Sequence, residues 1–152
     1  MQDNVCPMNR NCLALSLVYE ATISSTLPNY TPMKYIGLCE STFKKLYLSH
    51  VSSFCLIPYR NVSTLSSKYW RLKELNGNPS VTWRIIRHAK AYRPESKACR
   101  LYLCEKFEIA NYPEKNLLNK RTEVEAKCRH RNTYSTNQPC RTGLENVTWT
   151  FL

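Results

Sequence analysis

The sequence of 152 residues has no apolar run long enough to cross a membrane. Its first 25 residues also lack the basic start and apolar stretch of a secretory signal, because polar residues interrupt them from Asp3 to Asn11. It shows no internal repeat, no linker and no break in composition that would indicate a second domain. We therefore expect one domain of ordinary size, without a membrane partner.

Acidic residues are scarce, since 11 Asp and Glu stand against 22 Lys and Arg, giving a formal charge of +11. Such an excess favours a polyanionic partner, because neutralising phosphates releases their counterions. The alternative is a basic surface that serves only solubility. A nucleic acid is therefore the first class of partner to test.

Cysteine is not scarce, and its eight copies raise the alternative of a secreted disulfide protein. Three triplets of the glycosylation type, beginning at Asn29, Asn61 and Asn146, would fit that alternative. Such triplets also arise by chance, and no secretory signal accompanies them. A count of free thiols would separate the two cases.

Three segments alternate with a period of two, as strands do: residues 15–23, 33–38 and 80–86. The first two are close enough in sequence to form an antiparallel hairpin, which would bring Tyr19 near Tyr35. We expect these strands to form a small antiparallel sheet.

Helical spacing of apolar residues predicts helices over 43–54 and 98–110, and a third between them that begins at Ser63 or Thr64. Gly77 is expected to end this middle helix in a left-handed conformation. Residues 123–131 are either helical or extended. The expected organisation is an N-terminal cysteine-containing segment (1–12), a folded domain (13–131) and a tail (132–152).

The order of these elements resembles the GIY-YIG endonuclease domain. A strand carries Tyr19, the next carries Tyr35-Ile36-Gly37, a helix carries His50, and Glu105 and Asn119 follow. The stretches YIGLCESTFKKLYLSHVSSF, RIIRHAKAY, CRLYLCEK and LLNKR…KCRH are most similar to the version found in Penelope-like retroelements. The resemblance covers about residues 5–131 and implies an α+β fold with a three-stranded antiparallel sheet flanked by helices.

The resemblance also implies an enzyme that hydrolyses DNA phosphodiester bonds with Mg²⁺ or Mn²⁺. Glu105 would hold the cation and Tyr19 would be the general base. Tyr35 and His50 would position the phosphate and handle protons, and Asn119 would organise the site. Each has a structural alternative: the tyrosines as packing residues, His50 as a core histidine, and Glu105 as an exposed or paired carboxylate.

One position departs from the family in a way that matters for catalysis. The family carries Arg four residues before the histidine, whereas this chain has Leu46. Losing a group that stabilises phosphate charge in the transition state costs about 10²-fold or more in rate. Lys44 and Lys45 lie on other sides of the helix, so we expect the fold to survive and catalysis to be impaired. An inactive DNA-binding module is the alternative.

The resemblance further suggests a structural Zn²⁺. Its expected ligands are Cys6, Cys12, Cys128 and His130, with Cys99 as an alternate and unbound reduced thiols as the competing interpretation. Cys39, Cys55 and Cys140 are interpreted as buried or incidental residues.

Basic residues gather in the second half of the chain, near Glu105 and Asn119. The residues expected to bind DNA are Lys44, Lys45, Arg84, Arg87, Lys120 and Arg121. The resemblance implies a nuclear protein with DNA as its partner, and raises a reverse transcriptase of the same element as a second partner.

Overall fold

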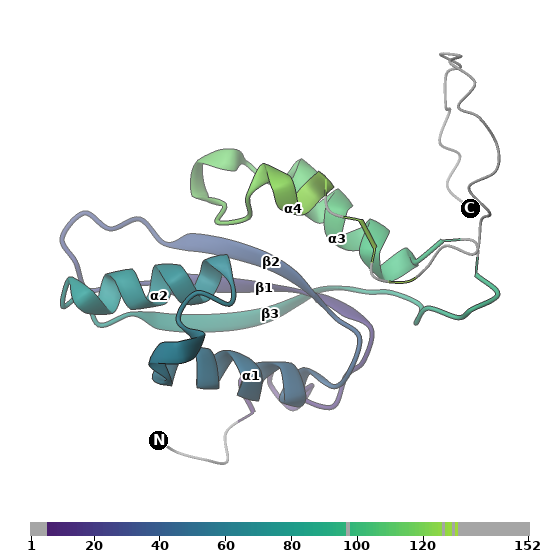
Figure 1. Cartoon of the computed structure of the whole chain (residues 1–152), viewed down its shortest axis with the longest axis horizontal. Coiled ribbons are helices and arrows are strands. Elements are labelled where there is room, and N and C mark those ends of the chain that lie inside the picture. The colour runs from purple at the N-terminus through teal and green to yellow at the C-terminus, as the bar shows by residue number, and fades with distance from the viewer. Residues whose placement is uncertain (1–5, 97, 126, 129, 131–152) are drawn as a thin grey trace.

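The computed structural model describes residues 6–96, 98–125, 127–128 and 130. Its centre is an antiparallel sheet of three strands, β1 (Leu17–Ser24), β2 (Met33–Cys39) and β3 (Ser80–His88), in the order β2-β1-β3 (Figure 1). The three expected strands and the α+β class are thereby confirmed. No helix among the described residues has the length and apolar character needed to span a bilayer.

Helices cover both faces of the sheet (Figure 1). Helices α1 (Phe43–Cys55) and α2 (Thr64–Glu74) pack on the face that carries Tyr19, whereas α3 (Arg100–Asn111) packs on the face that carries Val18. A short helix α4 (Arg121–Glu125) follows α3, and two single 3₁₀ turns, η1 (Ile57–Tyr59) and η2 (Glu114–Asn116), lie in the connections. The period-2 pattern of β1 therefore divides its side chains between two apolar clusters.

The middle helix begins as expected and ends differently. Ser63 caps α2 in a capping box with Ser66, so that each side chain bonds the other residue's backbone N–H. The left-handed residues after the helix are Asn76 (φ 56°) and Asn78 (φ 41°), so the prediction that Gly77 would take this conformation was wrong. Gly77 is needed for space instead, because a Cβ there would lie 2.4 Å from Ser25 Oγ.

The outer edge of β2 is covered by residues 117–119. The Leu118 N–H donates to the Lys34 carbonyl at 2.7 Å, and the Asn119 side chain bonds both backbone groups of Ile36. An edge strand that lacked such partners would leave N–H and C=O groups unpaired. The segment that follows α3 is therefore fixed against the strand that carries Tyr35 and Gly37.

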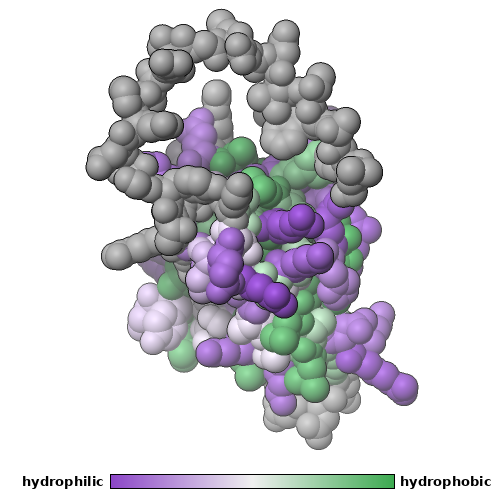
Figure 2. All heavy atoms as spheres, turned by 90° about the vertical axis from the view of Figure 1, so that its right-hand side faces the viewer, coloured by the Kyte–Doolittle hydropathy of each residue, from purple (hydrophilic) through white to green (hydrophobic). Residues whose placement is uncertain are grey.

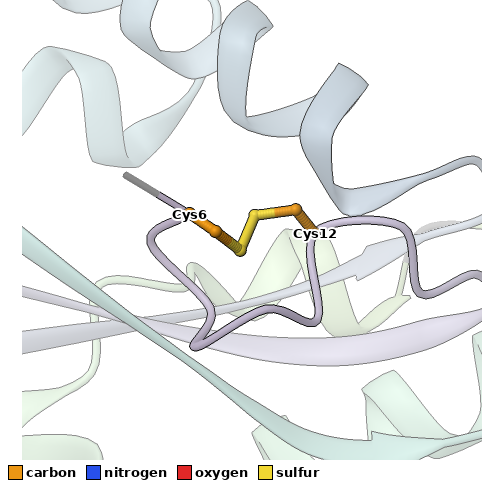
Figure 3. The surroundings of a disulfide bond; sticks show 2 residues. All are labelled: Cys6 and Cys12. Atoms are coloured by element: carbon orange, nitrogen blue, oxygen red, sulfur yellow. A yellow bond between two sulfur atoms is a disulfide. The ribbon is translucent and has the colours of Figure 1, made fainter. Parts of the chain in front are cut away.

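A disulfide joins Cys6 to Cys12 in the N-terminal loop (Figure 3). The loop packs on the core through Met8, which is 4% exposed. The expected zinc ligand set is therefore wrong in these two members, because sulfurs bonded to each other are not available as thiolate ligands. The expected tail, 132–152, lies outside the described residues, as does Cys140.

Candidate active site

A cleft of about 670 Å³ opens beside the edge strand β2. Four of the residues singled out in the sequence line it: Tyr19 on β1, Tyr35 on β2, His50 on α1 and Glu105 on α3. Because β2 is at the edge of the sheet, residues from helices on opposite faces can meet there. Their positions span much of the chain, and the fold brings them together. The catalytic roles inferred for them stay predictions.

Tyr19 and His50 form a buried pair in this cleft. The Tyr19 hydroxyl lies 3.0 Å from His50 Nε2, and the Tyr19 side chain is enclosed by the rings of Phe43, Trp83 and His50. Burial lowers the pKa of His50 to about 4. Burial, together with the nearby Tyr35 and Glu105, raises the pKa of Tyr19 well above its usual value. At neutral pH the Tyr19 hydroxyl therefore shares this hydrogen bond with an uncharged imidazole, and Tyr19 O–H is the donor when the imidazole proton is on Nδ1.

Gly37 makes room for Tyr19. The two residues are directly opposite each other on β1 and β2, and a Cβ added to Gly37 would lie 2.5 Å from the Tyr19 hydroxyl oxygen. Any side chain here would push the ring out of its place against His50. Gly37, the glycine of the Tyr-Ile-Gly triplet, therefore has a structural role: it leaves the space that the Tyr19 ring of the neighbouring strand occupies.

Glu105 is the mostly buried carboxylate of the cleft. Its side chain is 13% exposed, and Lys106 Nζ lies 3.2 Å from one of its oxygens. Burial raises its pKa and the carboxylate of Glu123 adds to this, while Lys106 and a hydrogen bond from the Leu38 backbone act in the opposite direction. A carboxylate in such a place favours a bound cation, which stabilises its ionised form.

Asn119 stands behind the cleft, outside its lining. Its side-chain oxygen accepts the Ile36 N–H at 2.8 Å, and its amide donates to the Ile36 carbonyl at 2.8 Å and to Glu123 at 2.7 Å. Asn119 thus holds the strand segment between Tyr35 and Gly37. Glu123, which lines the cleft, also accepts the Thr64 hydroxyl at 2.6 Å.

The role of Glu123 in the cleft was not predicted from the sequence. The one signal for it was its place four residues after Asn119, which allows contact only if the segment is helical. Since residues 123–131 had been left as either helical or extended, that contact could not be predicted. The structure makes Glu123 a second carboxylate beside Glu105.

Leu46 lines the cleft one helical turn before His50, at the position where the resembled family carries Arg. Lys44 and Lys45 are exposed on other sides of α1. Among the described residues, the cations that line the cleft are Lys106 and Lys127, which come from the other face of the sheet. The substitution at Leu46 therefore leaves the α1 wall of the cleft without a positive charge.

Two of the arginines expected to bind DNA are paired on the far strand of the sheet. Arg84 makes two 2.9 Å hydrogen bonds to the buried carboxylate of Glu20, and Arg87 bonds Glu108. The pKa of Glu20 is raised by burial but lowered overall by Arg84 and Lys34. Their contact with DNA stays a prediction, as does that of Arg121, whose side chain lies outside the described part.

A second group of side chains could hold a metal ion. Ligand atoms of Cys99, Cys128 and His130 all lie within 4.8 Å of one another. Cys99 caps α3, whereas Cys128 and His130 follow α4, so the cluster joins the two helices at their ends. The alternate ligand Cys99 thus stands with two of the four expected ligands.

The end of the molecule turned to the viewer in Figure 2 shows hydrophilic and apolar side chains next to each other.

Comparison of the chain with protein-family models, with curated proteins and with solved structures found no match. The functional assignment therefore depends on the chemistry of the cleft and on the order of its residues in the sequence.

Proposed function

We propose that the chain is a GIY-YIG-like endonuclease domain of the Penelope-like retroelement type, which hydrolyses DNA phosphodiester bonds with Mg²⁺ or Mn²⁺ and is slowed by Leu46. The observation that carries the proposal is the meeting of Tyr19, Tyr35, His50 and Glu105 in one cleft. A shared cleft is what phosphodiester hydrolysis needs: a carboxylate for a hard cation, a base for water, and groups that orient the phosphate.

The residues of the cleft fit a divalent cation. Glu105 would hold it through a mostly buried carboxylate, with Glu123 as a second oxygen donor nearby. When bound, such an ion neutralises charge on the phosphate and lowers the pKa of water. Lys106 pairs with one oxygen of Glu105 and donates to the Glu123 carbonyl, and from this place in the lining its charge would act on the phosphate.

The pair of Tyr19 and His50 supplies the path for a proton. As water attacks phosphorus, its proton passes to the Tyr19 oxygen while the Tyr19 proton moves to His50 Nε2 at 3.0 Å, in the tautomer that leaves Nε2 unprotonated. The bond from phosphorus to one sugar oxygen breaks in the same displacement, and that oxygen takes up a proton from solvent. His50 is uncharged at neutral pH because burial lowers its pKa to about 4. Burial also makes it a weak base, and the negative charge of a phosphate bound in the cleft would raise its pKa toward the range in which it accepts this proton. Tyr35, whose ring centroid lies 6.4 Å from that of Tyr19, also lines the cleft and would orient the phosphate.

The test is nicking of a supercoiled plasmid by the full chain in the presence of Mg²⁺. We expect slow nicking that Glu105→Gln and Tyr19→Phe abolish. Glu108→Gln is the matched control, because Glu108 lies on the same helix and pairs with Arg87 outside the cleft. Equal nicking by the Glu105→Gln chain, or nicking without a divalent cation, would contradict the proposal.

The second candidate is a DNA-binding module that does not cut. Leu46 favours it, because the α1 wall of the cleft lacks a charge for the transition state. A secreted disulfide glycoprotein is less well supported, since five cysteines of the described part are free. DNA binding without nicking, in the wild type and in Leu46→Arg, would favour the module.

We also propose that Cys99, Cys128 and His130 hold a structural Zn²⁺. His130 Nδ1 lies 3.4 Å from the Cys128 sulfur, and its Nε2 lies 3.5 Å from Glu40. With the metal on Nδ1, Nε2–H would donate to Glu40, an arrangement that orients zinc-bound histidines. A fourth ligand would complete the tetrahedral site that structural zinc prefers.

Zinc content of the purified full chain, measured by mass spectrometry, tests this second proposal. We expect one zinc ion per chain in the wild type. The Cys128→Ser variant should lose the zinc and should have a lower melting temperature than the wild type. Cys55→Ser is the control because Cys55 is an exposed free cysteine away from the cluster. Zinc that is absent from the wild type, or retained equally by both variants, would contradict it.

A further inference from the structure

A second hollow of about 600 Å³ lies beside the cleft, between the start of α2 and the segment that covers the edge of β2. We call it the α2 groove. Its lining comprises Tyr35, Asn61, Val62, Ser63, Thr64, Ser67, Lys68, Arg71, Leu118, Lys120 and Glu123. It shares Tyr35, Val62, Ser63 and Glu123 with the cleft, so the two hollows are next to each other.

The α2 groove is positively charged. Lys68, Arg71 and Lys120 line it, and none of them forms an ion pair within the described part of the chain. The one carboxylate in the lining, Glu123, is bonded to Thr64 and Asn119. Lys68 lies over the Tyr30 ring, and no ion pair of the described residues neutralises any of the three cations, while the two oxygens of the one carboxylate in the lining already have partners.

Resting on the proposed function, we propose that the α2 groove binds the phosphates of the DNA strand that flank the scissile phosphate in the cleft. A strand that passes Tyr35 would enter the groove directly, since this side chain lines both hollows. Ammonium, guanidinium and hydroxyl groups are the donors that phosphate oxygens take in protein–DNA contacts.

The groove is a better candidate than the other basic residues near the sheet. Arg84 and Arg87 are paired with carboxylates on β1 and α3 and lie at the opposite edge of the sheet from the cleft. Lys44 and Lys45 line neither hollow. Among the members of the expected DNA-binding set whose side chains the structure describes, Lys120 is the one that lies beside the cleft. Lys68 and Arg71 were not expected from the sequence.

The test measures binding without cleavage. A fluorescein-labelled DNA duplex is titrated with the full chain carrying Glu105→Gln, without divalent cations, at several salt concentrations, and anisotropy is recorded. The groove variant adds Lys68→Ala, Arg71→Ala and Lys120→Ala. The control adds Lys90→Ala, Arg93→Ala and Lys115→Ala, which remove the same charges from exposed positions outside both hollows.

We expect the groove variant to bind at least about tenfold more weakly than its parent and the control less than about threefold. The slope of log K against log salt should fall by about 0.9 for each phosphate that the protein no longer neutralises, so by about two to three in the groove variant. The single change Lys120→Ala, at an exposed position, should lower this slope by about one. It tests the proposal if the triple variant does not fold.

Equal weakening by the groove and control variants would overturn the proposal, as would a parent chain that does not bind DNA. Retained DNA binding together with impaired binding of polyglutamate would also overturn it, and would indicate an acidic protein partner. The nicking assay tests the proposed nuclease separately. Binding that depends on the groove, without nicking by any variant, would support the groove and contradict the nuclease. Nicking by the wild type, with a groove variant that binds DNA normally, would support the nuclease and contradict the groove.

Discussion

Replacing Gly37 by Ala should disturb the candidate site through its most closely packed contact. The added Cβ would lie 2.5 Å from the Tyr19 hydroxyl oxygen, 2.6 Å from Cζ and 2.9 Å from Cε1. The Tyr19 ring is 3% exposed and has aromatic neighbours on several sides, so it has little room to move. The ring must shift away from His50 and break the 3.0 Å hydrogen bond.

The loss of stability in Gly37→Ala can be estimated by adding the cost of overpacking to that of the broken hydrogen bond. Overpacking a core site by one methyl group costs about 1–3 kcal/mol, and the broken hydrogen bond a further 0.5–1.5 kcal/mol or so. We therefore expect Gly37→Ala to lower the free energy of unfolding by about 2–4 kcal/mol, measured by urea denaturation of the full chain. In the double variant Gly37→Ala/Tyr19→Leu the shorter side chain at position 19 should remove the clash. The coupling energy between the two substitutions should therefore exceed about 1 kcal/mol.

A Gly37→Ala chain as stable as the wild type to within about 0.5 kcal/mol would contradict this prediction. Additive effects of the two substitutions would refute it as well, because the clash involves both residues. Either result would mean that Gly37 serves the strand and not the Tyr19 ring.

Two further predictions concern stability. Burial lowers the pKa of His50 from its ordinary value of 6.5 to about 4, so the unfolded chain binds more protons than the folded chain between these pH values. The free energy of unfolding should therefore fall by up to about 3 kcal/mol as the pH drops from 6.5 to 4. His50→Gln should flatten this dependence in urea titrations and exposed His88→Gln should not; equal profiles for both would contradict it. Asn119→Ala leaves the buried backbone groups of Ile36 without partners, so it should cost about 1–3 kcal/mol and speed exchange of the Ile36 amide hydrogen, whereas unchanged exchange would contradict the interaction.

The sheet and the main helices could be predicted because their signals are local. The alternation in β1 and the spacing of apolar residues on α1 depend only on which side of an element faces the core. The end of α2 was harder. Asn as well as Gly tolerates a left-handed conformation, so the sequence alone did not decide which residue would take it.

The cleft was predictable only as far as the resemblance reached. The order of Tyr19, Tyr35, His50 and Glu105 indicated where to look, and the structure places all four on one cleft. Interactions between distant parts of the chain were missed, because the bonds of Glu123 depend on how residues 117–125 fold against β2.

The cysteines show the same limit. Spacing could not tell whether Cys6 and Cys12 would bond each other or turn toward Cys128. The disulfide and the cluster that includes Cys99 follow from how the termini pack on the sheet.

Mg²⁺-dependent plasmid nicking by Leu46→Arg tests the proposed nuclease activity most directly. Leu46 lines the cleft, so an Arg there can keep its stem on α1 and place its charge by the phosphate. A charge-assisted contact of about 1.5–3 kcal/mol corresponds to a gain of at least about tenfold. Leu48→Arg, at a position of α1 that is 53% exposed, should give none, and Glu105→Gln should abolish the gain. A folded Leu46→Arg chain that nicks no faster than the wild type would contradict the account.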